Sequence, residues 1–150
     1  MPLEGFAELD AQLAALGDAV TGKALRAMVR AGGNVVKKEA QANIPVGTRM
    51  HKTYKGRLVA PGFSKRSVRV VTKLDRSGQR ASAAIGVRSE AFYAAIFGEL
   101  GTSKTPARPW LRPAMANTQA AQIDAMGRAG LRSIKRAING PQRRPRTPRK

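Results

Sequence analysis

Residues 6–44 read FAELDAQLAALGDAVTGKALRAMVRAGGNVVKKEAQANI. Apolar residues recur at steps of three and four in the first half of this stretch, at Phe6, Leu9, Leu13, Leu16 and Val20. The helical pattern resumes after residue 18 with Leu25, Met28, Gly32, Val35, Val36, Ala40 and Ile44. This spacing is typical of an amphipathic helix, and Pro45 prevents the helix from continuing. We therefore predict one long helix or two consecutive helices over residues 6–43.

Two adjacent glycines, Gly32 and Gly33, interrupt this helical pattern. Each glycine costs a helix about 1 kcal/mol relative to alanine. Close packing of the helix against another backbone would explain their presence, and so would a local kink. The sequence leaves both explanations open.

The next segment, residues 45–66, follows neither a helical nor a strand period and contains several prolines and glycines. Long irregular segments in compact domains are usually functional or disordered. We predict a long basic loop or flap that becomes ordered against a partner. Its candidates for contact with a polyanion are Arg49, Lys52, Lys55, Arg57, Lys65 and Arg66.

Two β-strands are predicted after the flap, at residues 67–73 and 81–87. Valines mark the first segment, and Ala83, Ile85 and Val87 alternate along the second. The turn residues 75–78 between them favour an antiparallel hairpin. Because Arg69 and Lys73 would lie on the face opposite Val68 and Val70, we expect one face of the hairpin to be basic and exposed.

The main aromatic cluster follows, at Phe92, Tyr93, Ile96 and Phe97. We interpret it as a short helix or turn packed on the sheet. Its large apolar side chains are expected to belong to the core.

A proline-rich loop, residues 98–114, comes next, and its prolines fix the path of the chain. Glu99 stands between the aromatic cluster and a glycine–threonine turn. We expect its carboxylate to accept hydrogen bonds from backbone amides or to pair with Arg108 or Arg112. Pro113 is predicted to be the first residue of a C-terminal helix that ends before Asn139-Gly140-Pro141.

The expected domain organisation is a single α+β domain over residues 1–140. In it, a small antiparallel β-sheet packs against long N-terminal and C-terminal helices, and the 45–66 flap lies within the domain. Residues 141–150 form a basic, proline-rich tail that is expected to be disordered unless bound. The tail adds further candidate polyanion contacts at Arg143, Arg144, Arg146, Arg149 and Lys150.

The chain carries 28 basic and 9 acidic residues, a formal charge of +19. Such a charge implies a polyanionic surrounding, whether nucleic acid, acidic protein or acidic lipid. The first residues lack the pattern of a secretory signal, and no apolar run approaches the roughly 20 residues of a membrane-spanning helix. We expect a soluble protein that is made in the cytoplasm and has no contact with a membrane.

Catalytic patterns are missing from the sequence. The chain has no cysteine, and its one histidine, His51, stands in the basic flap with no acidic residue nearby. The carboxylates form no pattern typical of a two-metal or glycosidase site, and no phosphate-binding loop, helix-turn-helix or zinc spacing is present. We predict no catalytic residue, no cofactor and no metal.

The segments Glu99-Leu100-Gly101-Thr102 and Pro106-Ala107-Arg108-Pro109-Trp110-Leu111-Arg112-Pro113-Ala114 resemble a signature of tailed-phage neck and tail-completion proteins. In that family the pattern is Glu-aromatic-Gly-Thr followed by Pro-Ala-x-Pro-Phe-Leu-Arg-Pro-Ala. The order of a helical N-terminal third, strands, signature and C-terminal helix also agrees, over roughly residues 6–138. We call residues 99–113 the signature segment.

The resemblance implies a structural virion protein of a long-tailed phage, at the head–tail junction. It implies a homo-oligomeric ring, expected to be a hexamer, that surrounds the DNA passage and contacts neighbouring rings: a head-closure or adaptor protein and a tail terminator or tail tube. The implied contact residues are Glu99, Gly101, Thr102, Pro106, Arg108, Pro109, Trp110, Leu111, Arg112 and Pro113. The charge alone leaves an alternative open, a nonspecific nucleic-acid-binding accessory protein.

Overall fold

The computed structural model describes residues 6–139, with side chains from residue 22 onward apart from residue 138. The elements in chain order are α1 (Phe6–Asn43), β1 (His51–Lys52), β2 (Leu58–Val59), α2 (Phe63–Ser67), β3 (Val68–Leu74), β4 (Ala81–Val87), the 3-10 turn η1 (Ser89–Ala91), α3 (Phe92–Leu100), α4 (Leu111–Asn117) and α5 (Gln119–Asn139). The fold class is α+β, as predicted, with two small antiparallel hairpins rather than one.

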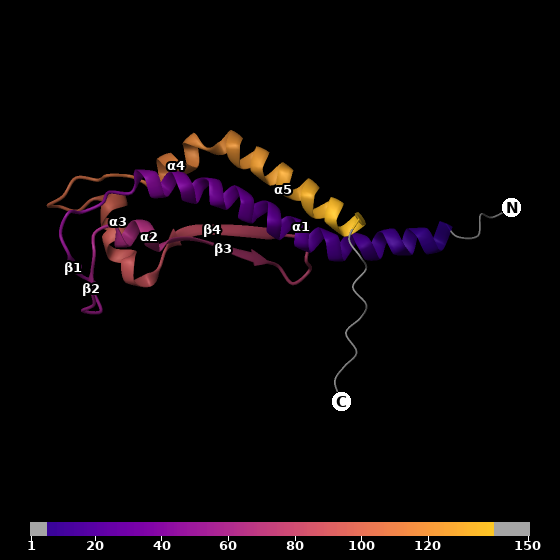
Figure 1. The fold of residues 1–150 in the computed structure, drawn as a ribbon, viewed down its shortest axis with the longest axis horizontal. Helices are drawn as coiled ribbons and strands as arrows, with labels where there is room; N and C mark the ends of the chain where they lie inside the picture. Colours follow the sequence, from indigo (N-terminus) through magenta and orange to yellow (C-terminus); the bar gives the residue numbers. More distant parts are fainter. Residues whose placement is uncertain (1–5, 140–150) are drawn as a thin grey trace, which may run out of the picture.

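Helix α1 is the central element of the molecule. It is one continuous helix over Phe6–Asn43, which decides between the one-helix and two-helix predictions. Figure 1 shows that α5 covers one side of α1 and that the β3–β4 hairpin covers the other. The fold therefore has three layers, with α1 in the middle.

The two adjacent glycines of α1 lie where the helix meets both neighbours. A Cβ atom at Gly32 would lie 2.9 Å from Cγ and Sδ of Met126 in α5, and one at Gly33 would lie 2.7 Å from Cγ1 of Val70 in β3. A third glycine, Gly130 of α5, receives the Met28 side chain of α1 in the same way, with Sδ at 2.9 Å. Close packing is therefore the reason for the paired glycines.

The β3–β4 hairpin confirms the predicted strands almost residue for residue. Val68 pairs with Val87 and Leu74 with Ala81 in an antiparallel register. The first strand begins one residue later than predicted, because residue 67 ends the short helix α2. As expected, Arg69 and Lys73 are exposed.

The 45–66 flap contains more regular structure than predicted. His51 and Lys52 pair with Val59 and Leu58 in a second hairpin, and α2 follows it. The prediction of an irregular loop was wrong for these residues, because two-residue strands are too short to show a period.

The C-terminal helical segment differs from the prediction in two ways. Helix α4 begins at Leu111, so Pro113 is its third residue and not its first. A proline fits there because the first N–H groups of a helix have no partner within the helix. The segment is also divided at Thr118, whose hydroxyl donates to the carbonyl oxygen of Ala114 at 2.6 Å.

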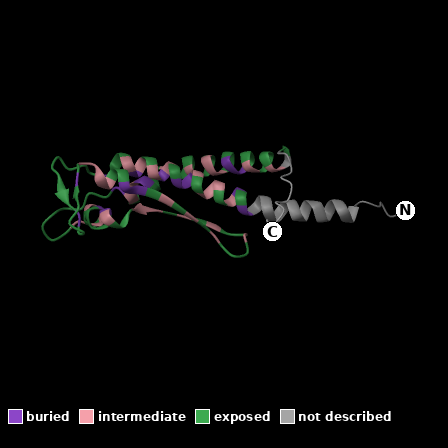
Figure 2. Cartoon of the chain, turned by 60° about the horizontal axis from the view of Figure 1, so that its bottom comes forward, coloured by how far each residue is buried: buried purple, intermediate pink, exposed green. Residues whose placement is uncertain are grey.

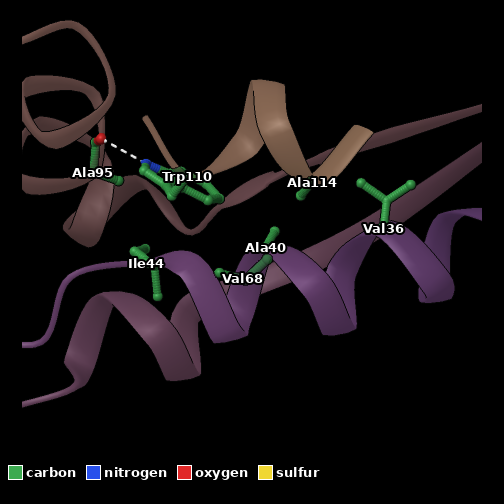
Figure 3. Packing of buried hydrophobic residues seen from close by; sticks show 7 residues of the cluster. All are labelled: Val36, Ala40, Ile44, Val68, Ala95, Trp110 and Ala114. Atoms are coloured by element: carbon green, nitrogen blue, oxygen red, sulfur yellow. Dashed lines mark hydrogen bonds between the residues drawn. The ribbon is translucent and has the colours of Figure 1, made fainter. Parts of the chain in front are cut away.

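The core lies where α1, α3, α4 and the start of β3 meet, and Figure 3 shows its packing. Its buried residues are Val36, Ala40, Ile44, Val68, Ala95, Trp110 and Ala114. In Figure 2 the buried residues gather along the middle of the molecule. Since Trp110 is the only large aromatic side chain in this cluster and three members are alanines, the core joins its elements by close backbone approach.

Candidate functional site

The Glu99 carboxylate holds the start of α4. Glu99 lies in the last turn of α3, and its Oε2 accepts hydrogen bonds from the backbone N–H groups of Trp110 at 2.6 Å and Leu111 at 2.9 Å. Its Oε1 accepts a third from the N–H of Arg112 at 3.2 Å. The first amides of a helix need such acceptors, so this side chain connects α3 to α4.

The electrostatics of Glu99 follow from this geometry. Its side chain is only 11% exposed, and the Arg112 guanidinium lies 3.8 Å from Oε1. Burial alone would raise the pKa of Glu99, but the three backbone donors and the Arg112 charge outweigh it and hold the pKa below its usual value. Both predicted kinds of partner are present, and the arginine is Arg112, not Arg108.

A tight turn follows Glu99. Gly101 has a φ of +76°, and a Cβ atom there would lie 2.7 Å from the backbone N of Ala107. Thr102 and Thr105 form an isolated β-bridge, and the Thr102 hydroxyl accepts from the N–H of Thr105 at 3.1 Å. Only glycine allows both the positive φ and the close approach of the Ala107 backbone at residue 101. These two requirements account for the glycine in this position of the signature segment.

Trp110, at the end of the same loop that leads into α4, anchors the loop in the core. Its side chain is 3% exposed, and its indole N–H donates to the carbonyl oxygen of Ala95 at 3.0 Å. Figure 3 shows this hydrogen bond between the loop before α4 and helix α3. The N–H of Arg108 donates to the carbonyl oxygen of Gly98 at 2.7 Å, so the loop is tied to α3 at three places.

The signature segment thus divides into an internal and an exposed part. Glu99, Gly101, Leu111 and Pro113 are partly buried and Trp110 is buried, and these residues shape the loop. The exposed members are Thr102, Pro106, Arg108, Pro109 and Arg112. A hollow of about 450 Å³ lies beneath the loop and is lined by Trp110, Arg108, Phe97, Ile44 and His51 among others.

Exposed aromatic side chains surround the start of α3, which corrects the prediction that they pack in the core. Phe92 is 48% exposed, Tyr93 51% and Phe97 51%. Tyr54 of the flap meets Tyr93 edge to face, with ring centroids 5.3 Å apart. The small residues Ala91 and Ala95 occupy the buried positions instead. We call Tyr54, Phe92, Tyr93 and Phe97 the aromatic patch.

The cations of the flap are exposed, and one of them lies beside this patch. The six predicted polyanion contacts of the flap are all exposed: Arg49, Lys52, Lys55, Arg57, Lys65 and Arg66. Lys55 places its ammonium 5.7 Å from the centroid of the Tyr54 ring, and Arg57 pairs with Glu90 at 3.4 Å. The other predicted contacts, at residues 143–150, lie outside the described residues.

A second exposed apolar surface was missed by sequence reasoning. On α5, Ile123 is 72% exposed, Leu131 62% and Ile134 42%. The residues of α5 that face α1 are smaller or more flexible, among them Met126, Ala129 and Gly130. The apolar spacing of this helix was visible in the sequence, but the spacing could not say which apolar residues face outward.

Among the side chains that the structure describes, which begin at residue 22, no group of three histidine or acidic side chains is placed to hold a metal ion. Within residues 6–139, no helix is both long and apolar enough to cross a membrane. The described surfaces are suited to contact with other molecules: they comprise a preorganised loop, an aromatic patch, exposed cations and an apolar helix face.

Comparison with known proteins supplies the family. Residues 7–101, well over half of the chain, match the model of the HK97-gp10-like family, described as "Bacteriophage HK97-gp10, putative tail-component". The matched part ends at Gly101, before most of the signature segment. No curated protein and no solved structure matches significantly. The chain therefore belongs to the HK97-gp10-like family of phage tail components and is a structural protein of the virion, not an enzyme.

Proposed function

We propose that the protein is a ring-forming component of the neck or tail-completion region, where it joins the head to the tail of a long-tailed phage. In this proposal several copies, most simply six, form a closed ring around the DNA passage. The aromatic patch and the exposed part of the signature segment contact neighbouring rings, on the head side or the tail side. The flap cations face DNA or an acidic neighbour.

The observation that carries this proposal is the exposed aromatic patch. Three half-exposed aromatic rings on one short helix, with Tyr54 packed against Tyr93, are unusual on a protein that works alone, because exposed apolar patches mark contact sites. Aromatic side chains are also the residues that most often dominate binding at interfaces. The patch is therefore suited to a partner within the virion.

The signature segment supports the same proposal. Glu99, Gly101 and Trp110 fix the loop from within, so the exposed residues Pro106 and Pro109 are held in place before any partner arrives. A preorganised loop loses little conformational entropy on docking.

The proposal is tested on purified protein and on particles. Native mass spectrometry should show a closed oligomer of a single stoichiometry, and purified virions should contain the protein. The double variant Tyr93→Ser, Phe97→Ser should fold, because both rings are half exposed, but particles carrying it should lack the head–tail connection. The matched control is Val71→Ser, at a 41%-exposed apolar position on β3. In particles that carry this variant, heads and tails should be joined as in the wild type. A protein that stays monomeric and is absent from virions would refute the proposal.

A second function, nonspecific binding of nucleic acid by an accessory protein, is favoured by the exposure of all six flap cations. Contacts with phosphates make affinity fall with salt, with a slope of about 0.9 per phosphate on duplex DNA. Removing residues 141–150, or introducing Lys52→Gln and Lys55→Gln, should lower that slope if these cations touch DNA. Arg76→Gln with Arg80→Gln, in the turn of the β3–β4 hairpin and away from the flap (Figure 1), is the charge-matched control. No measurable affinity at physiological salt would exclude this second function.

A further inference from the structure

The outward face of α5 is apolar with a basic border. Ile123, Leu131 and Ile134 recur at helical spacing and are each more than two-fifths exposed. Arg128 and Lys135, also exposed, stand three residues before and four residues after Leu131, and so border it on the helix surface. Arg128 already pairs with Asp124 of the same helix at 2.7 Å, and its guanidinium has further N–H donors for a second carboxylate. An apolar row with cations along its edge suits an amphipathic helix that carries acidic side chains.

The neighbouring face of α5 is already occupied. There α1 packs closely, with Met126 over Gly32 and Met28 over Gly130. Since Met126 and Gly130 make the contacts with α1 while Ile123, Leu131 and Ile134 stay exposed, the packing of α5 among the described residues does not account for these three side chains. These side chains remain available for another helix.

The sequence of the chain contains one segment with the complementary pattern. The first 22 residues hold four of the nine acidic residues, at Glu4, Glu8, Asp10 and Asp18, and no lysine or arginine. All 28 basic residues follow later. Within the same segment Phe6, Leu9, Leu13, Leu16 and Val20 repeat at helical spacing. The start of α1 is thus an acidic amphipathic segment in an otherwise strongly basic chain.

Geometry prevents this segment from reaching the outward face of α5 in its own subunit. Contacts at Gly32 with Met126 and at Gly130 with Met28 make α1 and α5 antiparallel, and Gly22 already lies beside the hairpin turn, near Gly78. Because α1 is continuous from Phe6, its first four turns lead away from these neighbours by roughly 20 Å. Figure 1 shows the start of α1 running past the ends of α5 and the hairpin.

We propose that residues 6–20 of one copy dock on the outward face of α5 of a neighbouring copy. The apolar stripe of the segment covers Ile123, Leu131 and Ile134, and its carboxylates meet Arg128 and Lys135. The two surfaces differ, so the contact is head to tail, and such contacts generate rings when the rotation closes. The acidic segment also offsets the repulsion between strongly basic subunits. This inference rests on the proposed ring and names the contact that builds it.

Cysteine crosslinking tests the contact directly, because the chain has no cysteine of its own. Leu13→Cys protein is mixed with Leu131→Cys protein at a concentration where the wild type assembles, and a flexible bismaleimide is added. We expect a covalent dimer that contains one copy of each variant. Mixing Leu13→Cys with Val71→Cys, which places the second thiol on β3, is the matched control and should give at least tenfold less dimer. Equal yields from both mixtures would overturn the proposed contact.

Charge reversal supplies an independent readout. Glu8→Lys, Asp10→Lys, Asp18→Lys in one variant, and Arg128→Glu, Lys135→Glu in another, should each weaken assembly about tenfold or more in native mass spectrometry. A 1:1 mixture of the two should recover assembly, because each reversed surface then meets its complement. Arg69→Glu with Lys73→Glu is the control and should assemble like the wild type. A wild-type ring insensitive to both reversals would overturn this contact and leave the ring standing, whereas a wild type that never self-associates would overturn both.

Discussion

Single residues of the signature segment connect α3 to the loop that leads to α4. Glu99 accepts three backbone hydrogen bonds, Gly101 permits the turn, and Trp110 fills the core while donating to Ala95. None of these roles involves catalysis. At this scale the geometry of the loop is explained by the folding of the subunit itself.

Glu99→Ala should lower the free energy of unfolding by about 1–2 kcal/mol, because three amides at the start of α4 lose their acceptor. Glu99→Gln keeps an acceptor oxygen but loses the charge, and should cost about 1 kcal/mol or less. Urea denaturation measures both. Glu90→Gln, which breaks only the pair with the largely exposed Arg57, should change stability by less than about 0.5 kcal/mol. Equal losses at residues 90 and 99 would contradict the capping role.

The capping role of Glu99 should also make the stability of the protein depend on pH. The pKa of Glu99 is lower in the folded protein than its usual value, so the ionised carboxylate stabilises the fold above the usual glutamate range. That contribution is lost as the pH falls through this range and past the lowered pKa. In Glu99→Gln this part of the acid-induced loss should be missing when urea midpoints are compared at neutral and acidic pH. Parallel curves for the wild type and the variant would argue against it.

Gly101→Ala should destabilise the protein by about 1–3 kcal/mol. The substitution forces a residue with a Cβ atom into a φ of +76° and places that atom 2.7 Å from the Ala107 backbone. Gly98→Ala, three residues earlier in α3, is the matched control, because a Cβ atom there meets nothing within 4 Å. It should be neutral or stabilising by up to about 1 kcal/mol. Thermal unfolding distinguishes the two, and a neutral Gly101→Ala would show that the turn is less constrained than described.

Among the secondary-structure elements, α1 determines where the others lie. Consecutive glycines let α5 approach one side of the helix and β3 the other, so the three layers share a single axis. A helix between two partners needs small residues on two sides, and the Gly32-Gly33 pair provides them.

Gly33→Ala should destabilise the hairpin layer by about 1–3 kcal/mol, because the new methyl group meets Val70 Cγ1 at 2.7 Å and a β-branched side chain cannot easily move aside. Val70→Ala in the same chain should relieve the clash. A double-mutant cycle should then show a coupling of about 1 kcal/mol or more. Gly32→Ala is the milder control, since the flexible Met126 can adjust. Additive effects at Gly33 and Val70 would contradict the close contact.

The sequence predicted elements well wherever a period extended over several turns or strand residues. The long helix, the strand 81–87 and the exposed cations of β3 all follow from such patterns. The 51–59 hairpin could not be predicted, because each strand has two residues. The division at Thr118 also left no periodic signal, since the helical spacing resumes directly after it.

The orientation of the apolar faces was harder to predict than the elements. Periodicity favours burial of the largest apolar residues, yet α3 buries Ala91 and Ala95 and exposes Phe92, Tyr93 and Phe97. Helices that approach closely bury their small residues, so the large ones are left on the surface. Glu99 was predicted correctly as an acceptor for backbone amides because its partners lie nearby in the sequence.

At the scale of the whole molecule, two of the exposed apolar surfaces are suited to contact, the aromatic patch near α3 and the outward face of α5. The first lies at the end of the subunit that also carries the flap, and the second runs along its side (Figure 1). In a ring, a side face suits contact between neighbouring copies, and an end face suits contact with the next ring. The two surfaces therefore fit the two kinds of contact that the proposed neck component needs.

A density map of the neck in assembled phage particles tests this account most directly. We expect the subunit in a closed ring coaxial with the DNA passage. The start of each α1 should lie against α5 of the next copy, and the aromatic patch should face an adjacent ring. Particles whose neck lacks the protein, or that carry it as isolated copies away from the axis, would contradict the account.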